Sequence, residues 1–172
     1  MAGSRLTVQR LRKKASFRMF KKLEASLKNL DPLDAAAELQ RIVSVGKGKE
    51  SPELYLLLGD RLQKAGDEAA ALEAFRKARE LDPKNMPAVS QLLCSLRRLD
   101  QKEEAWPLLK LLLYHHPGDQ TAKALLLKDA VELGKENETA LFFEELLKKY
   151  PQRKELYAAI RKLKQAAPPT SQ

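Results

Sequence analysis

Three short stretches contain residue types that bind phosphate or metal, or act as nucleophiles. Residues 46–51 read Gly-Lys-Gly-Lys-Glu-Ser, but a phosphate-binding loop needs Gly, four residues and then Gly-Lys-Ser/Thr after a strand. The adjacent His115 and His116 lack a nearby Cys or a spaced His that would complete a metal site. Cys94, the single cysteine, has no catalytic partner in the sequence. We therefore favour a linker, a helix end and a structural or groove-lining thiol, and expect no enzyme activity, metal or cofactor.

Composition indicates a helical protein in a reducing compartment. Strong helix formers dominate, charged residues make up 32% of the chain, and glycine is sparse. A lone thiol excludes an internal disulfide framework. No apolar run approaches the ~20 residues of a membrane span, and the basic N-terminus lacks the apolar core of a secretory signal. We expect a cytoplasmic protein, although a mitochondrial-type presequence remains open.

The positive charge is concentrated at the N-terminus. The chain carries a formal charge of +9, and residues 1–28 contain nine Lys or Arg against one acid, Glu24. The rest of the chain has 23 basic and 22 acidic side chains and is nearly neutral. A basic arm of this kind suits phosphates of nucleic acid or an anionic membrane. The four arm residues that we single out are Arg10, Arg12, Lys13 and Lys14.

A 34-residue period organises most of the chain. Pro83, Pro117 and Pro151 are separated by 34 residues each. The same step relates three further sets of positions: Phe75, Leu109 and Phe143; Ala78, Leu112 and Leu146; and Gly66, Asp100 and Gly134. A fixed period of this length is typical of stacked two-helix repeats.

The unit from 52 to 85 resembles the tetratricopeptide repeat. The positions that correspond to the family pattern are Tyr55, Leu58, Gly59, Leu62, Gly66, Ala71, Phe75, Ala78 and Pro83. Only Leu62 departs from the family pattern, which usually has Tyr there; the next two repeats match more weakly. The resemblance implies an all-α, right-handed superhelical solenoid with about four helical hairpins and a C-terminal capping helix.

The repeat register divides the chain into consecutive segments. Ahead of the repeats we expect a basic arm over 1–15 and a degenerate hairpin with a linker over 16–50, its helices at about 17–30 and 33–45. Behind them we expect a capping helix and a disordered tail. The three repeats cover 52–85, 86–119 and 120–153. The capping helix covers 154–165, and the tail covers 166–172.

Several residues have a defined role in this register. Gly59 and Ala71 are expected where two helices cross closely, and Gly66 and Gly134 where a left-handed C-cap follows a first helix. Asp67 is expected to cap the second helix. Trp106 is expected to pack between repeats. Pro107, next to it, is tolerable only in the first turn of its helix.

The resemblance also implies a binding surface. In such solenoids the first helices line a concave groove that binds peptides or helices, so we expect an adaptor or scaffold for another protein. The register places these residues in the groove: Leu56, Asp60, Gln63, Lys64, Gln91, Cys94, Arg97, Arg98, Leu125, Lys128 and Lys162. Self-association through the degenerate first hairpin also remains open. The alternative is binding of an anionic membrane or nucleic acid through the basic arm, with the solenoid as a mount.

The chain lacks the key residues of one subtype of the family. Repeat proteins that grip the acidic tails of heat-shock chaperones use Lys, Asn and Arg side chains on successive first helices. Leu56, Asp60, Gln91, Thr121 and Leu125 stand at those positions here. We therefore do not expect chaperone-tail binding.

Overall fold

The computed structural model describes residues 20–45 and 51–167, and their regular structure is α-helical. The chain divides into two compact halves, residues 1–84 and 85–172. The basic arm, linker residues 46–50 and the last five residues lie outside the described ranges. Within those ranges no helix is both long and apolar enough to cross a lipid bilayer.

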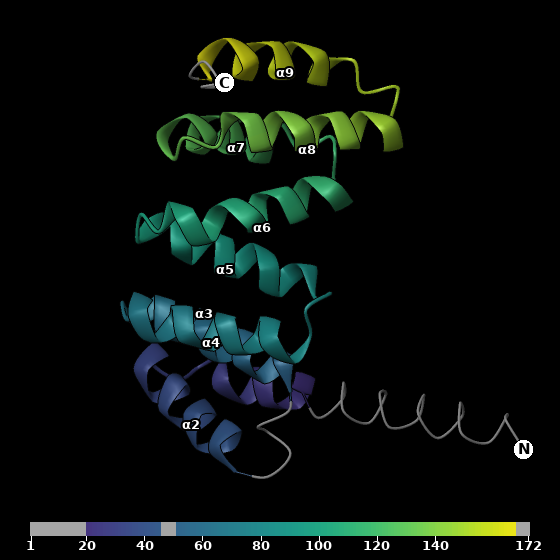
Figure 1. Ribbon diagram of the computed structural model, residues 1–172. Helices are drawn as coiled ribbons and strands as arrows, with labels where there is room; N and C mark the ends of the chain where they lie inside the picture. The colour runs from purple at the N-terminus through teal and green to yellow at the C-terminus, as the bar shows by residue number, and fades with distance from the viewer. Residues whose placement is uncertain (1–19, 46–50, 168–172) are drawn as a thin grey trace, which may run out of the picture. The chain divides into compact units, whose positions relative to one another are not determined.

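The N-terminal half consists of antiparallel helical neighbours (Figure 1). A helix over 20–27 is followed by α2 (Pro32–Ser44), α3 (Pro52–Lys64) and α4 (Glu68–Leu81). The α2 helix starts at a proline because the missing N–H is not needed in the first turn, and Asp31 caps it by accepting from Leu33 N at 2.9 Å. The helix packs on α3, and α3 on α4.

The close crossing of α3 and α4 depends on Gly59. A Cβ at this position would lie 2.7 Å from both Cδ1 and Cζ of Phe75, so no side chain fits. The Phe75 ring and Ala71 are fully buried beside it. The expected role of the small residues at this crossing is confirmed.

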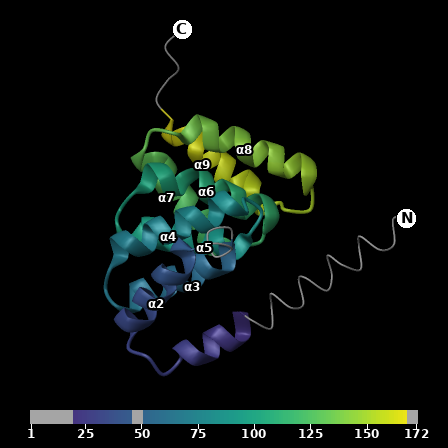
Figure 2. The same ribbon diagram turned by 90° about the horizontal axis from the view of Figure 1, so that it is seen from below.

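The C-terminal half contains α5 (Met86–Arg98), α6 (Lys102–His115), α7 (Gln120–Glu132), α8 (Glu136–Lys149) and α9 (Glu155–Ala166). Each helix packs on the next along the chain, with the pair α8 and α9 visible side by side in Figure 2. The helix α9 also contacts α7, and it buries Leu156, Ile160 and Leu163. It thereby covers the apolar face that a repeat array leaves at its end.

The turns between paired helices repeat one backbone geometry. Gly66 and Gly134 have φ values of 86° and 65°, and Asp100 occupies the equivalent place with a φ of 54°. Asp67 follows Gly66 and caps α4 by accepting from Ala70 N at 2.9 Å. The predicted glycine turns and the predicted Asp67 cap are confirmed.

Asp100 is therefore the strained member of this set, and replacing it by glycine is expected to stabilise the protein. A side chain in the left-handed region costs roughly 1–2 kcal/mol, whereas the exposed Asp100–Lys102 ion pair, at 2.9 Å, is worth at most about 1 kcal/mol. The Asp100→Gly variant should gain about 0.5–1 kcal/mol in the free energy of unfolding, measured by urea denaturation. A loss of stability would mean that the ion pair outweighs the backbone strain.

The prediction for Pro107 was wrong. The α6 helix begins at Lys102, so Pro107 lies in its second turn, inside the helix. A proline there removes the hydrogen bond that its N–H would have donated to the carbonyl of Glu103. Trp106, by contrast, is buried as predicted, and Lys135 of the next repeat lies over its ring at 4.4 Å.

Candidate partner-binding groove

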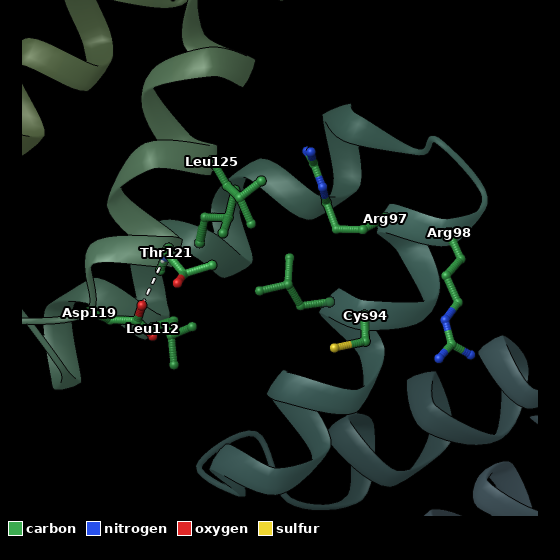
Figure 3. A pocket seen from close by; sticks show the side chains of 10 residues that line it. Cys94, Arg97, Arg98, Leu112, Asp119, Thr121 and Leu125 are labelled. Atoms are coloured by element: carbon green, nitrogen blue, oxygen red, sulfur yellow. Dashed lines mark hydrogen bonds between the residues drawn. The ribbon is translucent and has the colours of Figure 1, made fainter.

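A hollow of about 420 Å³ is lined by residues of α5, α6 and α7 and by Asp119, which precedes α7 (Figure 3). Its lining is mostly apolar and comes from ten residues: Leu93, Cys94, Arg97, Arg98, Leu109, Leu112, Asp119, Thr121, Ala122 and Leu125. The Cys94 thiol is exposed at its edge. The volume falls at the lower end of the range of roughly 300–1,000 Å³ found for ligand pockets.

The apolar floor follows from the residues of α6 that face the first helices. Leu109 and Leu112 stand where the N-terminal half has Phe75 and Ala78. Leu109 is fully buried and Leu112 half-buried, so the first belongs to the core and the second presents apolar surface to the hollow. Leu125 of α7 is also half-buried and completes this surface from the opposite side.

An ion pair joins α5 to α7 beside the hollow. The Arg97 guanidinium donates to both carboxylate oxygens of Asp129, with a distance of 2.6 Å to Oδ1. The Asp129 side chain is fully buried and that of Arg97 is 21% exposed. Because the charge of Arg97 is neutralised by a buried carboxylate, this residue holds the two helices together as well as lining the hollow.

A second ionic contact joins the start of α6 to the turn after α5 and to the end of α7. Lys102, at the start of α6, lies 2.9 Å from Asp100 after α5 and 2.9 Å from Glu132 at the end of α7. Hydrogen bonds to Glu132 and then to Asp100 raise the pKa of Lys102, and the hydrogen bond from Lys102 lowers the pKa of Glu132. Asp100 is exposed, and Lys102 and Glu132 are partly exposed, so solvent screens these contacts and their contribution to stability is small.

The opposite end of the hollow carries a carboxylate. Asp119 precedes α7 and caps it by accepting a hydrogen bond from Ala122 N at 2.9 Å. Thr121 lies beside it, and Figure 3 shows these two residues across the hollow from Arg97 and Arg98. The hollow therefore has a guanidinium end, an apolar middle and a carboxylate end.

The structure brings four of the predicted groove residues together at this hollow: Cys94, Arg97, Arg98 and Leu125. Gln91, Lys128 and Lys162 are exposed on α5, α7 and α9 but do not line it. Lys128 lies 3.7 Å from Glu132.

The other predicted groove residues belong to the N-terminal half. Leu56, Asp60, Gln63 and Lys64 all lie on α3. Asp60 and Lys64 form an ion pair at 2.8 Å, and the Gln63 amide donates to Glu68 at 3.3 Å. The four arm residues at positions 10–14 fall outside the described residues.

Sequence reasoning missed six residues of the lining: Leu93, Leu109, Leu112, Asp119, Thr121 and Ala122. Only first-helix positions were considered for binding, so Leu109 and Leu112 of α6 were not among the expected groove residues. The available signal was the replacement of Ala78 by Leu112 one repeat later, which places a larger apolar side chain between the helices.

Over residues 20–45 and 51–167 the structure holds no cluster of three or more His, Cys, Asp or Glu side chains arranged as metal ligands. His115 ends α6 and His116 caps it through a backbone N–H to Leu112 O, as predicted for a helix end.

Comparison with solved structures identifies the fold. The chain is similar to a structure titled "MamA MSR-1 C2", with 20% identity, a TM-score of 0.54 and coverage of 83% of this chain and 81% of the other. It is also similar to "MamA RS-1 ArsTM double mutant", with 18% identity, a TM-score of 0.57 and coverage of 87% and 94%. A third match, MamA from residue 41 to its end from Desulfovibrio magneticus RS-1, has 20% identity, a TM-score of 0.54 and coverage of 87% and 93%.

MamA is a tetratricopeptide-repeat protein, so these matches confirm the predicted all-α, tetratricopeptide-like fold. At this level of identity they bear on the fold and not on a shared partner. No protein-family model and no curated protein matches the sequence.

Proposed function

We propose that this protein is an adaptor or scaffold that binds a segment of another protein in the hollow between α5 and α7. The observation that carries the proposal is an open, largely apolar hollow lined from two successive first helices. Exposed apolar surface of this kind is costly to leave in water and marks interaction sites in soluble proteins.

The residues that line the hollow support binding of a protein segment. The hollow combines leucine side chains with the charged groups of Arg98 and Asp119 at its ends. Such a surface offers burial of apolar area together with directional polar contacts, which are the two components of a protein interface. The concave position of first-helix residues in tetratricopeptide folds fits the same role.

A blocking variant tests the proposal directly. Cys94 is exposed at the edge of the hollow, so Cys94→Trp fills the opening without removing a core residue. The full chain and this variant are used for affinity capture from a native lysate, followed by mass spectrometry. We expect a defined protein to be retained by wild type at high salt and lost from Cys94→Trp.

The matched control is Leu141→Trp, which adds the same ring at a position on α8 that is 61% exposed and lies outside the hollow. This control should retain the partner as wild type does. Equal retention by wild type, Cys94→Trp and Leu141→Trp would place partner binding away from the hollow and defeat the proposal.

The basic arm carries the second candidate function, because its charge is not balanced by nearby acids in the sequence. If it binds nucleic acid or an anionic membrane, that binding falls steeply as salt rises, since counterions compete for the same charges. Replacing Arg10, Arg12, Lys13 and Lys14 by serine should abolish it. Binding in the hollow should survive both the salt and these replacements.

A further inference from the structure

The terminal helix α9 stands in the register of a first helix, but within residues 51–167 no second helix follows it. Tyr157 comes three periods of 34 residues after Tyr55, which is half-buried where α3 packs on α4. At the same step, Arg161 occupies the place of the buried Gly59. On α9 this face is open, because Tyr157 is 61% exposed and Arg161 is exposed beside it.

Three cations on and just before α9 have no carboxylate partner among the described residues: Lys154, Arg161 and Lys162. All three side chains are exposed. The neighbouring cations are engaged, since Lys164 lies 2.7 Å from Glu144 of α8 and Arg153 lies 3.5 Å from Glu155. Uncompensated positive charge gathered on one helix favours a partner that supplies negative charge.

The contact with α8 shows how a packed helix meets the cations of α9. Glu144 reaches Lys164 from the neighbouring helix. On the open side, Lys154 and Arg161 are seven residues apart, which is about two helical turns, so they lie on one stripe. Tyr157 stands between them on that stripe and offers an exposed ring for a large apolar side chain.

The same residues narrow the kind of partner. Gly59 allows α4 to cross α3 closely, whereas Arg161 keeps another helix at the distance of a long side chain. This disfavours a second copy of the chain that continues the solenoid by close packing. Three unpaired cations are few for a nucleic acid, whose affinity grows with the number of phosphates neutralised.

We propose that this face of α9, formed by Lys154, Tyr157 and Arg161, docks an acidic helix of another protein. A large apolar side chain of that helix packs on Tyr157, and carboxylates on either side of it meet Lys154 and Arg161. The surface is separate from the hollow, because none of the residues that line the hollow belongs to α9. It therefore adds a second contact surface and does not depend on the proposed function.

The test selects displayed random peptides of about 14 residues, enough for about four helical turns, against the full chain. Peptides that also bind the double variant Tyr157→Ser/Arg161→Glu are removed, so those that remain need this face. We expect them to share one large apolar residue with Asp or Glu three or four residues away on both sides. They should become helical on binding, as measured by circular dichroism.

Charge reversal then assigns the contacts, with a fluorophore-labelled selected peptide as the probe. Arg161→Glu and Lys154→Glu should each weaken binding about three- to tenfold in fluorescence anisotropy. A peptide with Lys in place of the facing acid should bind Arg161→Glu more tightly than it binds wild type. That exchange of preference requires a direct contact, because a loss of structure in α9 would weaken both peptides.

Matched controls lie away from this face. Leu141→Ser removes an equally exposed apolar side chain, 61%, from α8, and Lys84→Glu reverses an exposed charge in the N-terminal half. Both variants should bind the peptide as wild type does. So should Cys94→Trp, because it blocks only the hollow.

The inference is overturned if the selected peptides are not acidic, if none needs the α9 face, or if the exchanged charges do not restore binding. It is also overturned if the double variant instead abolishes binding of a single-stranded oligonucleotide or dimerisation of the chain. The lysate capture with Cys94→Trp concerns the hollow alone. Failure of the proposed function and failure of this inference are therefore distinguishable.

Discussion

Replacing Arg97 by alanine is expected to lower the free energy of unfolding by about 3–5 kcal/mol. The Asp129 carboxylate that it pairs with is fully buried on α7, so removing the guanidinium leaves a buried charge without the partner that compensates its lost hydration. A buried charge without its partner is far more costly than the pair itself is favourable. The loss should appear in urea denaturation monitored by circular dichroism.

Two further variants show whether the buried charge is the cause. Arg98→Ala removes an exposed guanidinium from the next position of the same helix and should cost at most about 1 kcal/mol. The double variant Arg97→Met/Asp129→Leu removes both charges and should recover most of the loss. A cost below about 1 kcal/mol for Arg97→Ala alone would show that the buried carboxylate finds other partners.

Valine at Gly59 is expected to destabilise the N-terminal half by about 3 kcal/mol, at the upper end of the overpacking range. A Cβ at Gly59 would already lie 2.7 Å from two ring carbons of Phe75, whose side chain is fully buried. The helices α3 and α4 must then move apart or the ring must leave its rotamer. Thermal and urea unfolding of the full chain measure the loss.

The control for this variant is Ala69→Val, which places the same side chain at an exposed position of α4 and should cost well under about 1 kcal/mol. Adding Phe75→Leu to Gly59→Val removes the clashing ring carbons, as the natural pair Leu93 and Leu109 does one repeat later. The double variant should therefore lose less than the sum of its single variants. Strict additivity would contradict a steric clash between the two positions.

The repeat spacing predicted most of the helices because backbone geometry constrains where small residues, turn residues and prolines can stand in each repeat. Gly59 had to lie at a close crossing, and the positive φ of Gly66 and Gly134 follows from the same register. The turn at Asp100 keeps this geometry without glycine. The prediction that Pro107 lies in the first turn of its helix failed because the turn before Lys102, and not the proline, sets where α6 begins.

The candidate site was predicted less completely than the fold. Register alone located Cys94, Arg97, Arg98 and Leu125 on the groove face, but it could not show that Arg97 is paired. Asp129 stands between Leu126 and Ala130 in the sequence, and only tertiary packing decides that its carboxylate is buried against α5. The shape of the hollow likewise depends on how α6 side chains fill space between two helices that are not adjacent in sequence.

Alkylation of Cys94 measures occupation of the hollow most directly, because it is the only thiol in the chain and it lies at the edge of the hollow. The rate of reaction with iodoacetamide is followed by mass spectrometry with and without a saturating amount of the captured partner. If the partner binds in the hollow, the thiol is covered and the alkylation rate should fall at least about tenfold. A tenfold change corresponds to a free-energy difference of about 1.4 kcal/mol. An unchanged rate while the partner remains bound would contradict the account.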